Sequence, residues 1–317
     1  GLGLLPMRHR NLAVLGALLL VAVACTPGAT DPPTDAATDT PAAESPGAAA
    51  VPAIIPVLAS SEISQGPNRF LFSLTSPGGE LLAAPDVDVR LAFYDVDDDP
   101  DAVVFETDAR FLWAIEDVRG LYAADAEFPH AGRWATRFYA SFPDGREETV
   151  RADYDVWEES STPAIGAPAP VIDPPTAADV GGDLSRISSD PEPEPRFFEL
   201  SILDAVEADA PAVIAFVTPA FCQSATCGPT IEKVKAVAAE HPEVNVVQVE
   251  PYVMHVQDGY LQPLLSEAGA LQPAPWTTAW GLRTEPYVVV LDADGLVRAK
   301  FEGAITEAEL AEALAAL

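Results

Sequence analysis

The chain has 317 residues, enough for two ordinary domains with linkers, and 49% of the residues are hydrophobic. It carries 17 basic and 49 acidic residues, which give a formal net charge of −32 at pH 7. This balance excludes nucleic acid as a partner and electrostatic docking on an anionic membrane, because both need clustered Lys and Arg. The three cysteines are too few for a disulfide-rich scaffold.

The first residues have the pattern of a secretion signal. A short basic segment precedes the apolar run 12–24, which is too short to span a bilayer comfortably and has the length of a signal-peptide core. The run ends at Ala22-Val23-Ala24-Cys25 and resembles a bacterial lipobox, although Ala22 stands where that pattern favours Leu. The resemblance implies that residues 1–25 are a lipoprotein signal peptide and that Cys25 is lipidated. The alternatives are ordinary signal cleavage or an uncleaved anchor, with Cys25 incidental.

Lipidation of Cys25 predicts a protein anchored by its lipid to the cell membrane, on the extracytoplasmic side. Residues 26–61 are rich in Thr, Pro, Ala, Asp and Gly and lack periodicity. Such a segment buries too little apolar surface to fold, so we expect a disordered tether.

From residue 62 the hydrophobic pattern alternates with period two. The segments 70–74, 87–93, 122–128, 134–138 and 150–156 alternate in this way and are separated by turn residues such as Pro143-Asp144-Gly145. Short strands at regular spacing predict an all-β sandwich, and the pattern resembles that of an immunoglobulin-like domain over residues 62–157.

An acidic segment in this region has the spacing of a calcium-binding loop. Asp95, Asp97, Asp99, Asp101 and Glu106 match the ligand positions of an EF-hand, but Pro100 stands where the loop needs Gly. The flanks have the pattern of strands and not of helices. We therefore expect a solvated acidic turn and no metal site.

A Pro-rich linker over residues 158–195 precedes a final domain over residues 196–317. The elements expected there are a helix at 201–208, a buried strand at 212–217, a helix at 229–240 and a strand at 244–249, then a hairpin over 287–301 and a last helix. Thr306 and Glu309 form a capping box for that last helix. The alternation of helices and strands predicts an α/β fold.

The residues around the cysteines resemble the thioredoxin and redoxin superfamily. The apolar strand leads into Thr218-Pro219-Ala220-Phe221-Cys222, and Arg283-Thr284-Glu285-Pro286-Tyr287 precedes a later strand, where the family places a cis-proline loop that faces its thiols. The chain is thus expected to be multidomain, an all-β sandwich followed by an α/β thioredoxin-like domain. The resemblance implies that Cys222 and Cys227 are catalytic, that Thr284, Glu285 and Pro286 bind substrate, and that no cofactor and no metal is needed.

The spacing of the cysteines departs from the family pattern. Four residues separate Cys222 from Cys227, and residues five apart in a regular helix lie about 7.5 Å apart along its axis. A disulfide needs Cα atoms within about 7 Å, so the pair can close only if the segment before Pro229 is a loop. Strand register favours Cys222 as the attacking thiol, whereas a helix N-terminus would activate Cys227. Residues 215–217, at the end of the strand before the cysteines, include no acid that could assist proton transfer. The negative charge of Glu285 would disfavour ionisation of a nearby cysteine thiol.

We expect thiol–disulfide oxidoreductase activity on secreted or membrane-attached proteins that carry thiols or disulfides. The first alternative is copper binding and metal delivery, because Sco-type copper assembly factors combine a thioredoxin fold with two cysteines and a distal histidine; His255 is the candidate here. The second alternative is a non-catalytic binding module in which the disulfide is structural.

Overall fold

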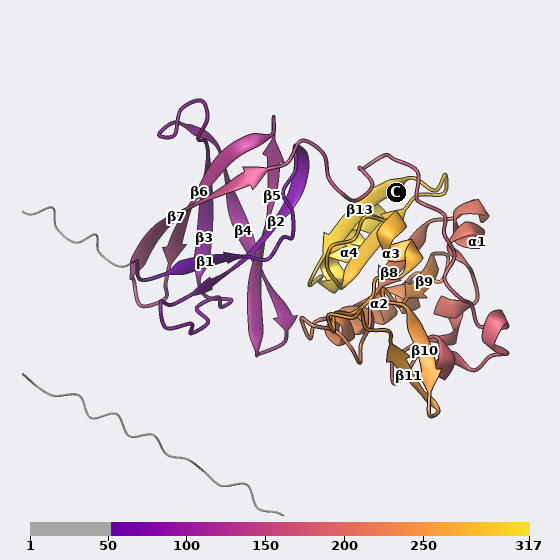
Figure 1. The fold of residues 1–317 in the computed structure, drawn as a ribbon. Helices are drawn as coiled ribbons and strands as arrows, with labels where there is room; N and C mark the ends of the chain where they lie inside the picture. The colour runs from indigo at the N-terminus through magenta and orange to yellow at the C-terminus, as the bar shows by residue number, and fades with distance from the viewer. Residues whose placement is uncertain (1–51) are drawn as a thin grey trace, which may run out of the picture. The chain divides into compact units, whose positions relative to one another are not determined.

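A computed structural model describes residues 52–317 of the chain (Figure 1). The expected signal peptide, the lipidation site Cys25 and most of the expected tether lie outside these residues. Within the described part of the chain, no helix is long and apolar enough to cross a membrane.

Seven antiparallel strands form the N-terminal part of the described chain. Their hydrogen-bonded order is β1-β2-β5-β4-β3-β6-β7. Strand β1 falls inside the range 26–61 that the sequence assigned to a tether. Its residues are ordered because their backbone pairs with that of β2. The strands are β1 (Ile55–Leu58), β2 (Gly66–Thr75), β3 (Asp88–Asp95), β4 (Val103–Ile115), β5 (Arg119–Phe128), β6 (Gly132–Ser141) and β7 (Glu147–Val156).

The long strand β4 joins two layers of this sheet. Its first half, up to Ala109, pairs with β3, and its second half, from Arg110, pairs with β5. The sheet folds back on itself, since Phe72 of β2 and Phe138 of β6 lie far apart in strand order and yet have ring centroids 5.0 Å apart. Edge-to-face aromatic pairs of this kind stabilise a core beyond the area that they bury. An immunoglobulin-type domain has two separate sheets, so β4 makes this arrangement different.

The acidic segment after β3 is a turn held by its own backbone. Asp95 accepts hydrogen bonds from the amides of Asp97 (3.1 Å) and Asp98 (3.3 Å), and Asp99 accepts one from the amide of Asp101 (3.0 Å). These carboxylates do not converge on a common point in the described residues. The structure shows an acidic turn in which Asp95 is buried and lies 3.0 Å from the ring of His130, whereas Asp97, Asp99 and Asp101 are exposed.

Three short 3-10 helices follow β7, at Ala178–Val180, Leu184–Arg186 and Pro195–Phe198. They lie along the segment that the sequence assigned to a linker and to the start of the last domain. The third buries Phe197 and Phe198 against the C-terminal core. This segment therefore contributes apolar side chains to the core that follows it.

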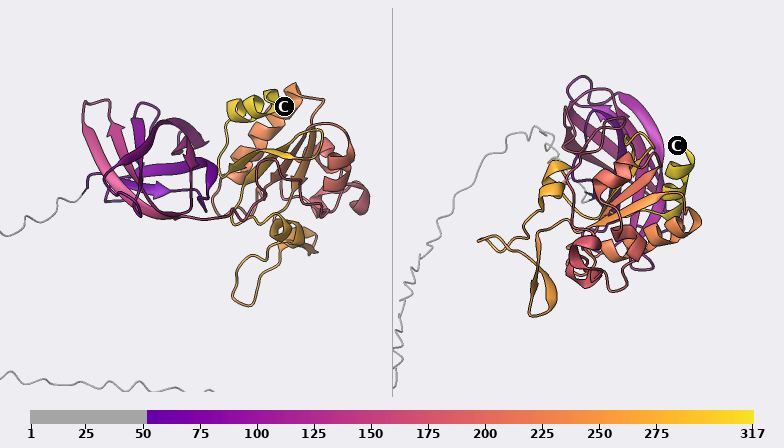
Figure 2. Two further views of the ribbon diagram at one scale, coloured as in Figure 1. Left: turned by 90° about the horizontal axis from the view of Figure 1, so that it is seen from above. Right: turned by 90° about the vertical axis from the view of Figure 1, so that its right-hand side faces the viewer.

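The C-terminal part contains a four-stranded sheet of order β13-β12-β8-β9. Strands β8 and β9 are parallel, and the other two pairs are antiparallel. A separate hairpin, β10 with β11, stands away from this sheet (Figure 2). The elements are α1 (Ile202–Glu207), β8 (Ala212–Phe216), α2 (Cys227–Glu240), β9 (Asn245–Val249), β10 (Met254–Gln257), β11 (Tyr260–Pro263), α3 (Pro275–Ala279), β12 (Tyr287–Leu291), β13 (Val297–Glu302) and α4 (Glu307–Ala315).

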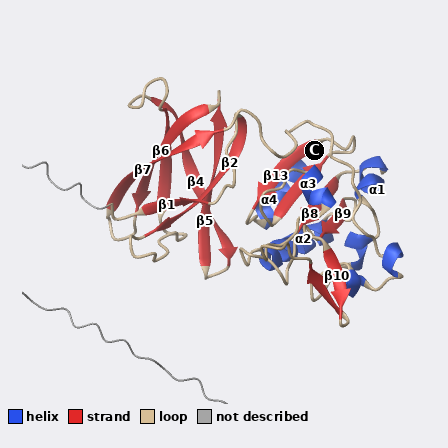
Figure 3. Cartoon of the chain, in the orientation of Figure 1, coloured by secondary structure: helices blue, strands red, loops and turns tan. Residues whose placement is uncertain are grey.

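The expected fold class, an all-β sandwich followed by an α/β thioredoxin-like domain, is wrong. The described residues are mostly β, with thirteen strands against four α-helices, and Figure 3 shows how strands dominate the chain. The α/β expectation came from the alternation of elements along the sequence, but alternation does not determine strand direction. In the C-terminal sheet one of the three strand pairs is parallel and two are antiparallel, and the β12–β13 pair is the hairpin that was expected over 287–301.

The capping box at the start of α4 is present as predicted. The Thr306 hydroxyl accepts from the amide of Glu309 (3.1 Å), and the Glu309 carboxylate accepts from the amide of Thr306 (3.0 Å). The same carboxylate pairs with Arg69 of β2 at 2.9 Å, and both side chains are largely buried. The helix start is therefore tied to the seven-stranded sheet.

Replacing Thr306 with Ala should lower the free energy of unfolding by about 1 kcal/mol, because a free amide at the start of α4 loses its acceptor. Thr306→Ser keeps the hydroxyl and serves as the matched control. Urea unfolding of the three proteins measures the effect. Equal stability of the Ala and Ser variants would contradict this role of the cap.

Candidate functional site

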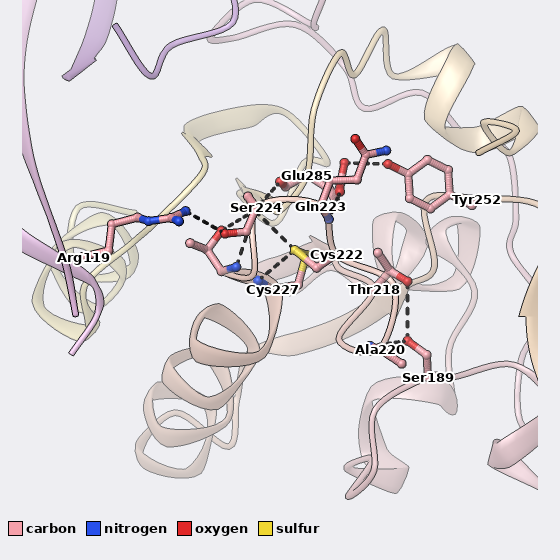
Figure 4. Close-up of a disulfide and its surroundings, with 11 residues drawn as sticks. Arg119, Ser189, Thr218, Ala220, Cys222, Gln223, Ser224, Cys227, Tyr252 and Glu285 are labelled. Carbon is pink, nitrogen blue, oxygen red and sulfur yellow. Dashed lines mark hydrogen bonds between the residues drawn. A yellow bond between two sulfur atoms is a disulfide. The ribbon is translucent and has the colours of Figure 1, made fainter. Parts of the chain in front are cut away.

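The two loops that carry the predicted site residues meet because of one strand pairing. Strand β8 ends at Phe216, and β12 begins at Tyr287, its direct antiparallel partner. The loop that leaves the end of β8 therefore starts beside the loop that enters β12. The first loop carries Cys222 and the second carries Glu285, and Figure 4 shows them side by side.

Cys222 and Cys227 form a disulfide with their Cα atoms 5.9 Å apart. Cys227 is the first residue of α2 and is completely buried, whereas Cys222 lies in the loop and is partly buried. The amide of Cys227 points at the Cys222 sulfur at 3.2 Å. The pair thus closes across a loop as expected, although the helix begins at Cys227 and not near Pro229.

Glu285 is buried beside the disulfide and is held by two donors. One carboxylate oxygen accepts from the amide of Gln223 (3.1 Å), and the other accepts from the hydroxyl of Tyr252 (2.7 Å). Burial and this carboxylate raise the pKa of Tyr252, so the phenol stays protonated and donates. Pro286 follows through a cis peptide bond and is buried, and Thr284 is partly exposed.

Ser224 connects the loop to its surroundings. Its hydroxyl lies 3.3 Å from the Cys222 sulfur and donates to the backbone carbonyl of Glu285 (3.2 Å). Its own carbonyl accepts from the guanidinium of Arg119 at 2.9 Å. The sequence analysis missed Ser224, Tyr252 and Arg119 as neighbours of the cysteines, because no local pattern connects positions so distant along the chain.

A buried acid lies one strand away from the cysteine loop. Glu250 directly follows β9, is 6% exposed, and accepts from the amide of Ser189 at 2.6 Å. Ser189 in turn accepts from the amide of Ala220 in the loop that leads to Cys222 (3.3 Å). Burial raises the pKa of Glu250 to about 7. The strand before the cysteines lacks an acid, as expected, but the neighbouring strand supplies one to the same region.

One group of described residues brings metal-ligating atoms together. A sulfur of Cys222, a sulfur of Cys227 and a carboxylate oxygen of Glu285 all lie within 4.8 Å of one another. His255, the distal ligand expected for a copper site, lies in β10 and is not part of this group; its ring nitrogen faces Gln257 at 3.4 Å. The third potential ligand is a carboxylate and not an imidazole.

No family profile and no curated protein matches the chain. Among the solved structures that it matches is a DUF4426 family protein from Pseudomonas aeruginosa PAO1, with 8% identity, a TM-score of 0.23, and 31% of this chain and 79% of that chain covered. CopC from Methylosinus trichosporium OB3b matches with 16% identity, a TM-score of 0.22, and 33% and 97% covered. MtrC from Shewanella baltica OS185 matches with 10% identity, a TM-score of 0.23, and 35% and 24% covered.

The thioredoxin-like assignment is wrong, because the described chain is mostly β, with thirteen strands against four α-helices. The oxidoreductase assignment rested on that resemblance and is corrected with it. The disulfide that the sequence predicted is present. The assignment of the pair as a redox-active centre was drawn from the family resemblance alone and is not carried further.

The buried carboxyl group of Glu250 should make stability depend on pH. Its folded pKa of about 7 lies above its ordinary value of 4.5, so the folded state binds the proton more tightly than the unfolded chain. The free energy of unfolding should therefore fall as pH rises from about 4.5 to about 7, by up to about 3 kcal/mol. Asp190 adds to this cost by repulsion.

Glu250→Gln keeps an acceptor for the Ser189 amide and removes the titration. The difference in unfolding free energy between the natural protein and this variant, measured by urea unfolding at pH 5 and pH 8, should shift by about 2 to 3 kcal/mol in favour of the variant at pH 8. A difference that does not change with pH would show that Glu250 is ionised throughout.

Proposed function

We propose that the reduced protein binds a thiophilic metal ion, Cu(I), through the thiolates of Cys222 and Cys227. The observation that carries this proposal is the proximity of the two cysteines, whose Cα atoms are 5.9 Å apart. Soft thiolate ligands select Cu(I) over hard cations. The proposal keeps the two cysteines of the Sco-type alternative and leaves out His255, which lies outside the group of ligating atoms.

Metal binding requires that the disulfide first be opened. Two electrons and two protons from an external thiol reductant convert the Cys222–Cys227 bond into two thiols, and the thiols release their protons when the metal binds. The sulfurs start close enough to share one ion, because their Cα atoms are 5.9 Å apart. Exchange with an external disulfide, which takes up the two electrons and becomes two thiols, would re-form the Cys222–Cys227 bond and release the ion.

Glu285 is better placed as a neighbour of this ion than as its ligand. Each of its carboxylate oxygens already accepts a hydrogen bond, from Gln223 and from Tyr252. A site of two thiolates and one carboxylate would favour Zn²⁺, which takes oxygen ligands readily. Two thiolates alone suffice for Cu(I), so the satisfied carboxylate favours the copper proposal.

A structural disulfide is the second candidate, and the burial of Cys227 favours it. Cys227 is completely buried in the core that α2 forms with β8 and β12. Closing this loop holds the segment 222–227 against the start of the helix. The bridge would then stabilise a binding module without taking part in its chemistry. Binding of secreted thiol or disulfide proteins and lipid attachment at Cys25 stay predictions.

A titration of the reduced protein with Cu(I) should show binding of one ion, monitored by competition with a chromophoric chelator. Cys222→Ser and Cys227→Ser should each weaken binding by at least about tenfold, because one thiolate is lost. Glu285→Gln and His255→Ala should bind as the natural protein does. A Zn²⁺ titration tests the alternative ion.

Three results would contradict the copper proposal. The first is the absence of tight Cu(I) binding by the reduced protein. The second is Cu(I) binding that survives in the double Cys→Ser variant. The third is tighter binding of Zn²⁺ than of Cu(I), with loss of Zn²⁺ binding in Glu285→Gln.

Opening the disulfide should lower the free energy of unfolding by about 2 kcal/mol, as expected for a short closed loop. Urea unfolding with and without reductant, compared with the Cys222→Ser/Cys227→Ser variant, measures this difference. The variant should not respond to the reductant. A natural protein that is equally stable in both redox states would contradict the structural role.

A further inference from the structure

The loop between the two cysteines holds one residue in an unfavourable backbone conformation. Ala225 has a φ of 61°, which lies in the left-handed region, where the Cβ of an L-residue crowds its own backbone. In the described part of the chain, the other non-glycine residues with positive φ are aspartates, whose short polar side chains make this region less costly: Asp117, Asp209 and Asp258. Ala225 lacks such a side chain, so its conformation is imposed by the loop.

Contacts on both sides of Ala225 impose this conformation. On one side, the Ser224 carbonyl accepts from the guanidinium of Arg119 at 2.9 Å (Figure 4). On the other side, Cys227 is completely buried as the first residue of α2. The disulfide joins Cys227 to Cys222 and confines the four residues between them to a closed ring. The Ala225 side chain is exposed, so no packing of its methyl group offsets the strain.

We propose that strain at Ala225 shifts the Cys222–Cys227 loop toward its open dithiol form, which on the proposed function is the form that binds the metal. The positive φ is imposed while the ring is closed. Once the sulfur–sulfur bond is broken, Cys222 is free to move, and Ala225 returns to a right-handed or extended conformation. Strain that is present in the closed form and absent from the open form favours opening.

Opening of the ring should also be felt at the start of β5. The Ser224 carbonyl belongs to the rigid peptide unit that precedes Ala225, so a change of φ at Ala225 turns this carbonyl. A turned carbonyl no longer faces Arg119, the first residue of β5. The hydrogen bond between the cysteine loop and the seven-stranded sheet is therefore a property of the closed ring.

Equilibrium with glutathione measures the shift. Two glutathione thiols supply two electrons that break the Cys222–Cys227 bond, their two protons pass to the cysteine sulfurs, and glutathione disulfide forms. The full chain is equilibrated with a chelator present, in mixtures of both glutathione forms, and the dithiol fraction is measured by alkylation and mass spectrometry. Ala225→Gly should change the equilibrium constant by about threefold in favour of the disulfide, because Gly adopts positive φ readily and loses part of this gain to its greater freedom in the open loop.

Gln223→Gly is the matched control. Gln223 is exposed in the same ring and does not have a positive φ, so this change adds the freedom of a glycine without relieving strain. It should not favour the disulfide. Ala225→Val should favour the dithiol, because a β-branched residue tolerates positive φ less well than Ala. In the natural protein, the NMR signals of the Arg119 guanidinium should change when the disulfide is reduced.

The proposal fails if Ala225→Gly has the same equilibrium constant as the natural protein, or if Gln223→Gly favours the disulfide as much as Ala225→Gly does. Arg119 signals that are identical in the oxidised and reduced natural protein would overturn it as well. These measurements are made without metal, so they stand apart from the copper titration. Absence of Cu(I) binding would remove the proposed function and leave the shift in the glutathione equilibrium unchanged.

Discussion

The antiparallel pairing of β8 with β12 is the constraint on which the C-terminal region depends. It sets Phe216 directly opposite Tyr287, so the chain leaving one strand meets the chain entering the other. The disulfide, the buried Glu285 and the cis peptide bond before Pro286 all follow these two strand ends. Both strands are completely buried, and a shift of register by one residue would turn every side chain of the shifted strand to the other face. The geometry of the site is therefore determined by packing of the sheet and not by the loops themselves.

The hydrogen bonds of the site come from several distant segments. Glu285 is held by Gln223 and Tyr252, and Glu250 is held by Ser189. Each carboxyl group is buried, and each has at least one backbone amide as a donor. A buried acid without such donors would cost several kcal/mol. The segment around Ser189, whose composition resembles a linker, is thus part of the support of the site.

Local signals predicted much of this arrangement. The capping box of Thr306 and Glu309 needs only four consecutive residues, so it could be identified without knowledge of the fold. Closure of the Cys222–Cys227 loop followed from helix geometry and from Pro229. The β10–β11 hairpin was missed, although Asp258-Gly259 is a strong turn signal; both residues have positive φ, 53° and 85°. The burial of Glu250 could not be predicted, because it depends on contacts about sixty residues away. The antiparallel pairing of β8 with β12 was equally inaccessible from the sequence.

Strand β4 has a consequence for how the seven-stranded sheet opens. Residues up to Ala109 belong to one layer and residues from Arg110 to the other, so neither layer has an independent boundary there. Separating the layers requires breaking the ladder at both ends of the same strand. The sheet should consequently behave as a single cooperative unit, in which the central amides of β4 exchange with solvent only when the whole sheet unfolds.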